Sequence, residues 1–373
     1  MSKKGENIYK RKDNRWEGRY KKGRKGNGTI QYGYIYGKTY SEVKDRLYTE
    51  KFKYLSIIET NGECTLTYQT YCLKWLERRK IVLKKSTYAT YLYKLKKYVF
   101  PYIGERPLNQ ISRETIQTMI TTWIDQSLQP TTIHVTYQIM KQPLYEAYQE
   151  ELIAKFPCKK VLLPKRQPKR VKSISRLEEV KIEKQAKKLP LTKALPVLLA
   201  LKSGLRIGEV AALRWEDVDL KKRLIKIKST YQRIPYSDGN EKSELLLAPA
   251  KTHNSAREIP ISPNLYKWLK RGHKKAEGPF VCSETRCPRE PRLITYHFHQ
   301  LLKKCGLQGI HFHQLRHTFA TRCLEAQGNI TAISTLLGHA SAKMTLDTYT
   351  DADIVSLRET ILKKERAENK LTA

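Results

Sequence analysis

The sequence predicts a multidomain protein that is mainly α-helical with small β-sheets. Its 373 residues exceed one ordinary domain of about 150 residues. Aromatic, β-prone runs lie near the N-terminus, whereas long later segments carry apolar residues at helical spacing. We therefore expect a small β-rich N-terminal module, a helical bundle and a mixed α/β C-terminal domain.

Residues 1–60 are predicted to form the small basic module. Trp16–Tyr20 and Gln31–Gly37 are β-prone, and a turn rich in Gly and Lys separates them. Ser41 is the expected cap of a following helix. The alternative is a basic, partly disordered tail. The aromatic residues disfavour it, because a tail that supplies only charge does not need them.

Residues 64–160 are predicted to be a bundle of four helices. Tyr68, Tyr71, Cys72 and Trp75 recur at helical spacing in the first of them. Pro101 is expected to stop the second helix. Residues 161–176 read as an exposed linker, because prolines and basic residues dominate there.

Residues 177–373 are predicted to mix helices with an antiparallel sheet. An apolar helix ends at a turn of Ser203 and Gly204, and a second helix follows. The alternating segments 223–230, 244–250 and 256–262 are the expected strands of one sheet.

The composition excludes several classes of protein. The formal net charge is +36, and such an excess is typical of a chain with a polyanionic partner. No apolar run is long enough to span a membrane, and the N-terminus lacks the apolar core of a secretory signal. The seven cysteines are an odd number scattered along the chain, which favours the reducing cytosol over a disulfide framework.

Four short motifs place basic side chains where they could act together. They are Gly204-Leu205-Arg206 with Glu209, His313-x-x-Arg316-His317, Leu337-Gly338-His339, and Tyr349. Alone each is weak, because an Arg–Glu pair at helical spacing is usually a solvated surface pair. A histidine and an arginine on one helix face in so basic a chain favour a phosphate site.

Together and in this order, the motifs resemble the signature of the tyrosine recombinases. The chain is most similar to integrases of Gram-positive temperate phages and conjugative transposons. The resemblance covers nearly the whole length and implies an arm-type DNA-binding module, a SAM-like core-binding domain, and a catalytic domain with a C-terminal tail helix. It also requires a lysine on a β-hairpin between the two arginines, and Lys251 fits that place.

The resemblance implies a catalytic role for Arg206, Lys251, His313, Arg316, His339 and Tyr349. Guanidinium groups suit the negative charge that develops on a phosphate under attack. Tyr349 would attack and remain bonded as a 3′-phosphotyrosine. His313 would take its proton, Lys251 would protonate the departing 5′ oxygen, and His339 would donate a hydrogen bond to the phosphate. Glu209 and His317 would lie behind the catalytic groups, and Glu209 would orient the basic cluster.

No cofactor and no metal are expected in this site. Cys282, Cys287, His297 and His299 raise the possibility of zinc, but their spacing matches no common zinc module. The chain also lacks a glycine-rich phosphate loop for ATP.

The implied partner is double-stranded DNA at core and arm sites, with self-assembly into a tetramer on that DNA. An excisionase or a host DNA-bending protein is a further candidate partner, and no membrane is involved. The implied location is the bacterial cytoplasm, at the nucleoid.

The leading interpretation is a site-specific DNA recombinase that integrates and excises a mobile element or prophage. One alternative is an enzyme like the type IB topoisomerases, which relaxes DNA without strand exchange. The other is a catalytically silent DNA-binding regulator. The filled catalytic positions disfavour the regulator, and the N-terminal module favours recombination because it implies a second class of DNA site.

Overall fold

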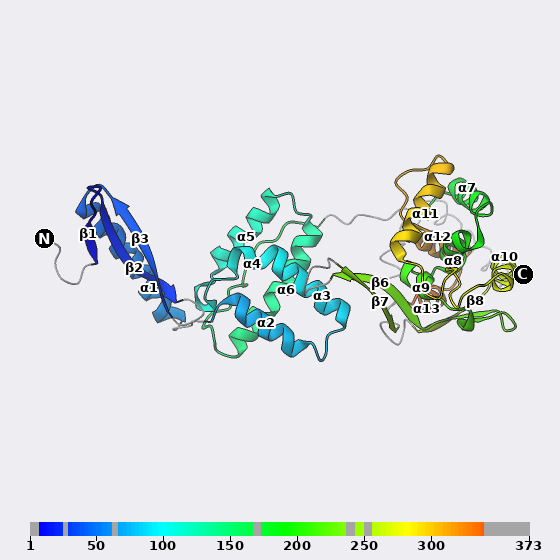
Figure 1. Cartoon of the computed structure of the whole chain (residues 1–373), viewed down its shortest axis with the longest axis horizontal. Coiled ribbons are helices and arrows are strands. Elements are labelled where there is room, and N and C mark those ends of the chain that lie inside the picture. Colours follow the sequence, from blue (N-terminus) through cyan, green and yellow to red (C-terminus); the bar gives the residue numbers. More distant parts are fainter. Residues whose placement is uncertain are drawn as a thin grey trace, which may run out of the picture. The chain divides into compact units, whose positions relative to one another are not determined.

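The computed structural model describes residues 7–24, 29–61, 66–166, 173–235, 243–249 and 256–338 (Figure 1). The chain divides into two compact units, Met1–Gln167 with Pro235–Lys242, and Pro168–Ile234 with Ser243–Ala373. Within the described ranges, no helix is both long enough and apolar enough to cross a membrane. The mainly helical class with small sheets is confirmed, whereas the four predicted segment boundaries stay a prediction.

A three-stranded antiparallel sheet and one helix form the N-terminal module. In chain order its elements are β1 (Ile8–Lys10), β2 (Trp16–Arg24), β3 (Ile30–Gly37) and α1 (Tyr40–Asn61). The central strand is β2, which pairs with both others. A Cβ on Gly18 would stand 2.8 Å from Val43 Cγ1, so α1 packs directly on the strand.

The predicted helix cap was wrong by two residues. Thr39 Oγ1, and not Ser41, accepts a hydrogen bond from the backbone N–H of Glu42, at 3.2 Å. The Glu42 carboxylate in turn accepts from the backbone N–H of Lys38. A hydroxyl caps a helix when it precedes the first turn, and Ser41 already lies inside that turn.

The second part of the first unit is the predicted helical bundle. Its elements are α2 (Tyr68–Arg79), α3 (Lys85–Lys94), η1 (Leu95–Val99), α4 (Phe100–Ile103), η2 (Leu108–Gln110), α5 (Arg113–Asp125) and α6 (Pro130–Gln149). Trp75, Trp123 and Tyr68 fill its core, each with its polar atom paired. Trp75 Nε1, for example, donates to Glu146 at 2.7 Å. The core therefore buries large aromatic surfaces without an unpaired indole or phenol at these three positions.

Pro101 does not stop the second helix of the bundle, contrary to expectation. The helix widens into the π-helical turn η1 and continues as α4, which has Pro101 in its first turn. A proline is tolerated there, because the N–H that it lacks would have no partner within α4. The helix ends only at Gly104, whose N–H donates to Phe100 O at 2.9 Å.

The second unit packs helices around a small sheet. Its elements are α7 (Arg176–Ala186), α8 (Leu191–Ser203), α9 (Ile207–Ala212), η3 (Trp215–Asp217), β4 (Val218–Asp219), β5 (Leu224–Ile227), β6 (Ser229–Pro235), β7 (Ser243–Pro249), β8 (Arg257–Pro260), α10 (Pro263–Lys274), α11 (Pro291–Lys304), α12 (Phe312–Glu325) and α13 (Ile330–Leu337). The centre is α8, in which every residue of 194–201 is buried. A helix that is apolar all round must be enclosed, and α7, α10, α11 and α12 all contact it.

The predicted three-stranded sheet was partly wrong. The segment 223–230 pairs directly with 256–262, as β5 with β8, and β4 completes that sheet. The segment 244–250 instead forms a separate two-stranded sheet with β6. Ile225 and Ile259 face the buried core of the unit, whereas β7 has no buried residue. Alternation thus predicted the strands, but burial determined which of them pair.

Gly204 is the point where α8, α12 and α13 meet, and it should not accept a side chain. It ends α8 with φ at +65°, and a Cβ there would lie 2.6 Å from Phe319 Cδ1 and 3.0 Å from Leu337 Cδ2. Gly204→Ala should lower the free energy of unfolding by about 1–3 kcal/mol more than a left-handed alanine alone costs.

The matched control is Gly306→Ala, which has φ at +67° but no atom within 4 Å of the added Cβ. Urea unfolding followed by circular dichroism measures both variants. If the free energy of unfolding fell equally in the two variants, the close packing at Gly204 would be contradicted.

Candidate active site

The turn between α8 and α9 presents the first predicted arginine. Arg206 stands at the N-cap of α9, with its side chain 36% exposed. Glu209, one turn later, reaches back to it. Glu209 Oε1 accepts from Arg206 Nη1 at 2.8 Å, and Oε2 accepts from the Arg206 backbone N–H at 2.9 Å. The helix start therefore orients the guanidinium through a carboxylate that also caps the helix.

A third arginine, absent from the predicted set, shares that carboxylate. Arg257 begins β8, and its side chain is only 4% exposed. Its Nη1 and Nη2 donate to the two oxygens of Glu209 at 3.0 and 2.9 Å. Burial raises the pKa of Glu209, but the hydrogen bonds and charge of Arg257 and the charge of Arg206 outweigh it, and the pKa falls below its ordinary value. Glu209 is therefore ionised and held from two sides.

Arg316 is buried at 3% exposure inside α12. Its fork donates to two backbone carbonyls, with Nη1 2.7 Å from Gly204 O and Nη2 2.5 Å from Leu337 O. These bonds fix the guanidinium plane between the end of α8 and the end of α13. The predicted partners Arg206 and Arg316 thus meet at one place, although 109 positions separate them in the sequence.

The C-terminal end of α13 brings the three arginines together. Its last carbonyls accept one donor each: Leu336 O from Arg257 Nε at 2.6 Å, Leu337 O from Arg316, and Gly338 O from Arg206 Nη2 at 3.0 Å. A helix leaves these carbonyls unpaired and its dipole is negative at this end, so cations stabilise it. Gly338 has φ at +61° and caps the helix. We call these three side chains the arginine cluster.

Two histidines of α12 lie beside the arginine cluster. The rings of His313 and His317 meet edge to face, with centroids 4.6 Å apart. Desolvation of the ring and the charges of Arg316 and Arg206 lower the pKa of His313, although the residue as a whole is exposed. Burial, His313 and Arg316 lower the pKa of His317 to about 4. Both are therefore mostly neutral near pH 7, and a neutral imidazole can accept a proton.

Three predicted site residues, Lys251, His339 and Tyr349, lie outside the described residues. Their connections along the chain are nevertheless informative. Lys251 belongs to the segment between β7 and β8, and His339 directly follows Gly338.

The four residues that raised the possibility of zinc do not form a metal site in the described part of the chain. Cys282 is buried and Cys287 is exposed. Among the residues that the structure describes, no three His, Cys, Asp or Glu side chains lie close enough together to hold a metal ion.

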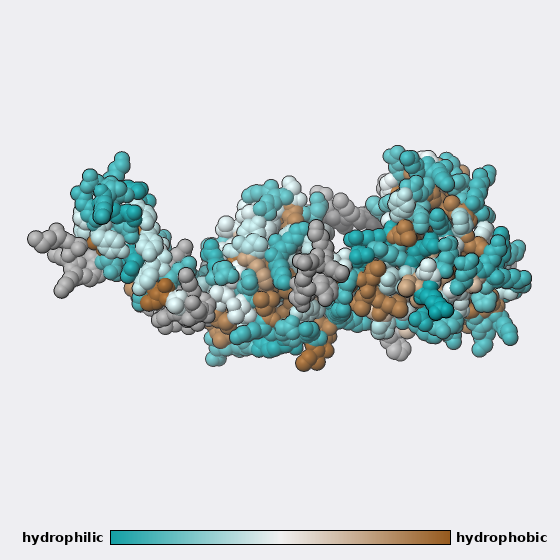
Figure 2. Space-filling view, in the orientation of Figure 1, coloured by the Kyte–Doolittle hydropathy of each residue, from teal (hydrophilic) through white to brown (hydrophobic). Residues whose placement is uncertain are grey.

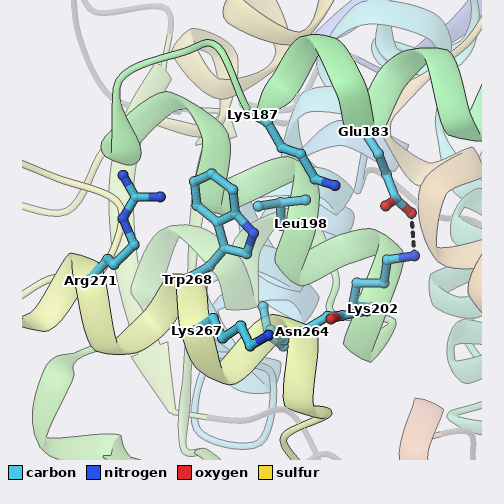
Figure 3. Close-up of a pocket in the computed structure, with 9 residues that line it drawn as sticks. Glu183, Lys187, Leu198, Lys202, Asn264, Lys267, Trp268 and Arg271 are labelled. Carbon is cyan, nitrogen blue, oxygen red and sulfur yellow. Dashed lines mark ion pairs between the residues drawn. The ribbon is translucent and has the colours of Figure 1, made fainter.

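A cavity of about 430 Å³ lies elsewhere in the second unit, between α7, α8 and α10 (Figure 3). Trp268 forms one wall with Arg271 against its ring, and Lys202 points to Glu183 across the opposite side. None of the predicted catalytic residues lines it. The cavity is thus separate from the arginine cluster.

The sheet of the N-terminal module has an open face opposite α1. Cross-strand partners on this face are Arg19 with Tyr34 and Lys21 with Tyr32. The Arg19 guanidinium lies 4.1 Å from the centroid of the Tyr32 ring. Tyr34 and Tyr36 are 51% and 43% exposed, and the module surface is largely hydrophilic in Figure 2. Basic groups and exposed rings thus share one sheet face, on which the buried Glu17 is the cross-strand partner of Tyr36.

Two family models match the chain. The model of the phage integrase family matches residues 171–354, and that of the phage integrase N-terminal SAM-like domain matches residues 67–124. The chain belongs to the phage integrase family of tyrosine recombinases.

Relatives of this integrase-family chain extend over most of its length. A XerC-like tyrosine recombinase of Caldanaerobacter subterraneus is 27% identical over 358 residues, which cover 88% of this chain and 90% of the relative. The transposase of transposon Tn916 from Enterococcus faecalis is 25% identical, with 85% and 82% covered. The ICEBs1 integrase of Bacillus subtilis is 22% identical, with 76% and 79% covered.

Two solved structures share the integrase fold. The Tn1549 transposon integrase in complex with transposon right-end DNA superposes with a TM-score of 0.68 at 21% identity, covering 80% of this chain and all of that one. A lambda integrase dimer bound to a core site gives 0.61 at 18% identity, covering 95% and 97%. These likenesses support the same fold for this integrase.

The sequence offered a signal for Arg257 that went unused. The alternation of β8 places Arg257 on the same face as Ile259, which is buried. A charged residue on a buried strand face must have a partner. Glu209 was the available carboxylate, since it had already been placed beside Arg206.

The depressed pKa of His317 predicts how the stability of this integrase depends on pH. The unfolded histidine, with a pKa of about 6.5, binds a proton before the folded one does. Stability from this group is thus complete above pH 6.5 and is lost as the pH falls toward 4. Urea unfolding between these pH values should show a smaller acid loss in His317→Gln than in the wild type.

A direct measurement is the NMR titration of the His317 imidazole in the folded protein. A midpoint near the value of an unfolded histidine would contradict the effect of burial and of the neighbouring charges.

Proposed function

We propose that the chain is a site-specific DNA recombinase, an integrase that cleaves and rejoins DNA through a 3′-phosphotyrosine to integrate and excise a mobile element. The observation that carries this proposal is the convergence of Arg206, Arg316 and the neutral His313 at the end of α13. The relatives named as transposon and ICEBs1 proteins support a mobile element as the cargo.

The arginines clamp the scissile phosphate. Attack on a phosphodiester concentrates negative charge on its non-bridging oxygens, and preoriented guanidinium groups stabilise that charge. Arg316 is preoriented by its two carbonyl bonds, and Arg206 by Glu209 and Gly338. Little reorganisation is therefore needed as the transition state forms.

The bond changes balance within the protein and the DNA. The phenolic oxygen of Tyr349 forms a bond to phosphorus, and the bond from phosphorus to the 5′ oxygen breaks. His313 takes the phenolic proton, and Lys251 gives a proton to the 5′ oxygen. His339 donates a hydrogen bond to the phosphate. Because one phosphodiester replaces another, the reverse step with a different 5′ hydroxyl rejoins the DNA without ATP.

Duplex DNA is the proposed partner, bound by more than one part of the chain. The proposed boundaries are an arm-type module at 1–60, a core-binding domain at 64–160, a linker at 161–176 and a catalytic domain at 177–373. The net charge of +36 favours a polyanion as the partner. Each phosphate that the chain neutralises should make the slope of log binding constant against log salt concentration more negative by about 0.9.

Assembly into a tetramer on DNA is part of the proposal. A likeness to the lambda integrase tetramer bound to a Holliday junction supports it, with a TM-score of 0.60 at 19% identity. An excisionase or a host DNA-bending protein remains a candidate partner. The reaction would take place in the bacterial cytoplasm, at the nucleoid.

The two alternatives, a type IB topoisomerase-like enzyme and a catalytically silent DNA-binding regulator, are less favoured. Relatives over most of the length are named as recombinases, integrases and transposases, which disfavours an enzyme that only relaxes DNA. A catalytically silent regulator would not form a covalent adduct, so one experiment separates it from an integrase.

That experiment uses a nicked suicide substrate in the presence of EDTA. The wild type should accumulate a covalent adduct linked through a 3′ phosphate, because the broken strand cannot be rejoined. Tyr349→Phe keeps the ring but lacks the attacking oxygen, so it should bind DNA and form no adduct. An adduct in this variant, or one mapped to another tyrosine, would show the nucleophile to be misassigned.

The open sheet face of the N-terminal module should bind the arm sites. Tyr34→Ala removes an exposed phenol from that face and should weaken arm-site binding by about 1–3 kcal/mol, because its hydroxyl can donate a hydrogen bond to a duplex phosphate. Tyr48→Ala is the matched control, because Tyr48 is 55% exposed but lies on α1. Footprinting on DNA with both classes of site measures the effect. Loss of core-site protection in Tyr34→Ala, with arm protection intact, would refute this assignment.

A further inference from the structure

We propose that Arg257 is a positioning residue that offsets the charge of Glu209, so that the triad of Arg206, Glu209 and Arg257 presents a net positive charge to the scissile phosphate. The inference rests on the proposed function, because it concerns the same phosphate clamp. In this role Arg257 acts on the phosphate through Glu209, to which both of its terminal nitrogens donate.

The geometry shows one carboxylate shared between two guanidinium groups. Oε1 of Glu209 accepts from Nη1 of both arginines, at 2.8 Å from Arg206 and 3.0 Å from Arg257. Oε2 accepts from the Arg206 backbone and from Arg257 Nη2, both at 2.9 Å. Both carboxylate oxygens therefore have two donors each.

The charges of this triad sum to plus one. Were Arg257 neutral, Glu209 would offset Arg206 completely, and a guanidinium with a close carboxylate attracts a phosphate less strongly. Burial strengthens this effect, because Glu209 and Arg257 are 6% and 4% exposed and water screens them little. Arg257 therefore supplies the charge that Glu209 would otherwise remove from the clamp.

Arg257 is held in place independently of Glu209. Its Nε donates to Leu336 O at 2.6 Å, and it starts the strand β8, which pairs with β5. A side chain tied at both Nε and Nη has one orientation. It therefore acts as a fixed counter-charge rather than as a second ligand of the phosphate.

Two single substitutions separate charge from shape. Arg257→Lys keeps the positive charge, whereas Arg257→Gln keeps hydrogen-bonding capacity without charge. In single-turnover adduct formation, Arg257→Gln should be about 10–100-fold slower, the range seen when groups behind a charged site are lost. Arg257→Lys should stay much closer to the wild type. Affinity for the core site should fall much less than the cleavage rate, because the phosphate carries more negative charge in the transition state than in the bound substrate.

A double substitution gives the result that a purely structural role would not. In Arg257→Gln with Glu209→Gln, the net charge returns to plus one because the carboxylate is gone. Cleavage should therefore be faster in the double variant than in Arg257→Gln alone. If Arg257 had only a structural role, adding Glu209→Gln to Arg257→Gln would leave the cleavage rate as low as in the single variant or lower it further.

Glu258→Gln is the matched control. Glu258 is the next residue of β8, exposed and paired with Lys226 at 3.4 Å on the outer face, so its loss should not alter cleavage. Absence of an adduct in the wild type would refute the proposed function itself. Normal wild-type cleavage with equally slow Lys and Gln variants, or without rescue in the double variant, would overturn only the role of Arg257.

If Arg257→Gln did not fold, the Lys variant would decide the matter alone. A folded, DNA-binding Arg257→Lys that cleaved as fast as the wild type would support the charge role. One that lost tenfold or more would overturn it.

Discussion

The arrangement of the second unit depends on three guanidinium groups that hold the carbonyl end of α13. Transferring a charged group out of water costs several kcal/mol unless partners replace the water. Here the partners are one shared carboxylate and backbone carbonyls, at distances between 2.5 and 3.0 Å. Since Arg206, Arg257 and Arg316 come from a turn, a strand and a helix, the same bonds that stabilise the charges also fix these elements.

An excess of positive charge over carboxylate in this region has a second effect. Together with desolvation by burial, which is the larger cause, it lowers the pKa of His313 and of His317, so that both rings are mainly neutral where an arginine remains charged. One local environment thus favours an anion at the site and a neutral imidazole, free to accept a proton, beside it. Neither property requires a histidine with unusual chemistry of its own.

Much of the fold was predictable, because the residues that an element buries are apolar and recur in the sequence with the period of that element. The continuous apolar run of α8 and the aromatic strands of the N-terminal module are examples. Strand partners were less predictable, since alternation alone does not say that β7 leaves the sheet of β5 and β8. Pro101 was misread because a π-helical turn offers a proline a fresh helix start.

The candidate site likewise has a part that the sequence predicted and a part that it did not. Arg206, Glu209, His313 and Arg316 were found through motif order, and the structure brings them together. Arg257 was missed among 72 basic residues, since most arginines are exposed and no motif singled it out. The carbonyls of Leu336, Leu337 and Gly338 had no sequence signal at all, because every residue carries a carbonyl.

The size of the N-terminal core has a thermodynamic consequence. Among the described residues of the module, the buried apolar side chains are Ile8, Val43 and Leu47, with a few rings packed around them. So small a core leaves little margin over the entropy of the chain. Any ligand that binds only the folded module raises its stability by RT ln(1 + [L]/Kd). If the module binds arm DNA as proposed, occupancy of that site would increase the folded fraction of the module, which links the order of this part of the chain to the concentration of its DNA.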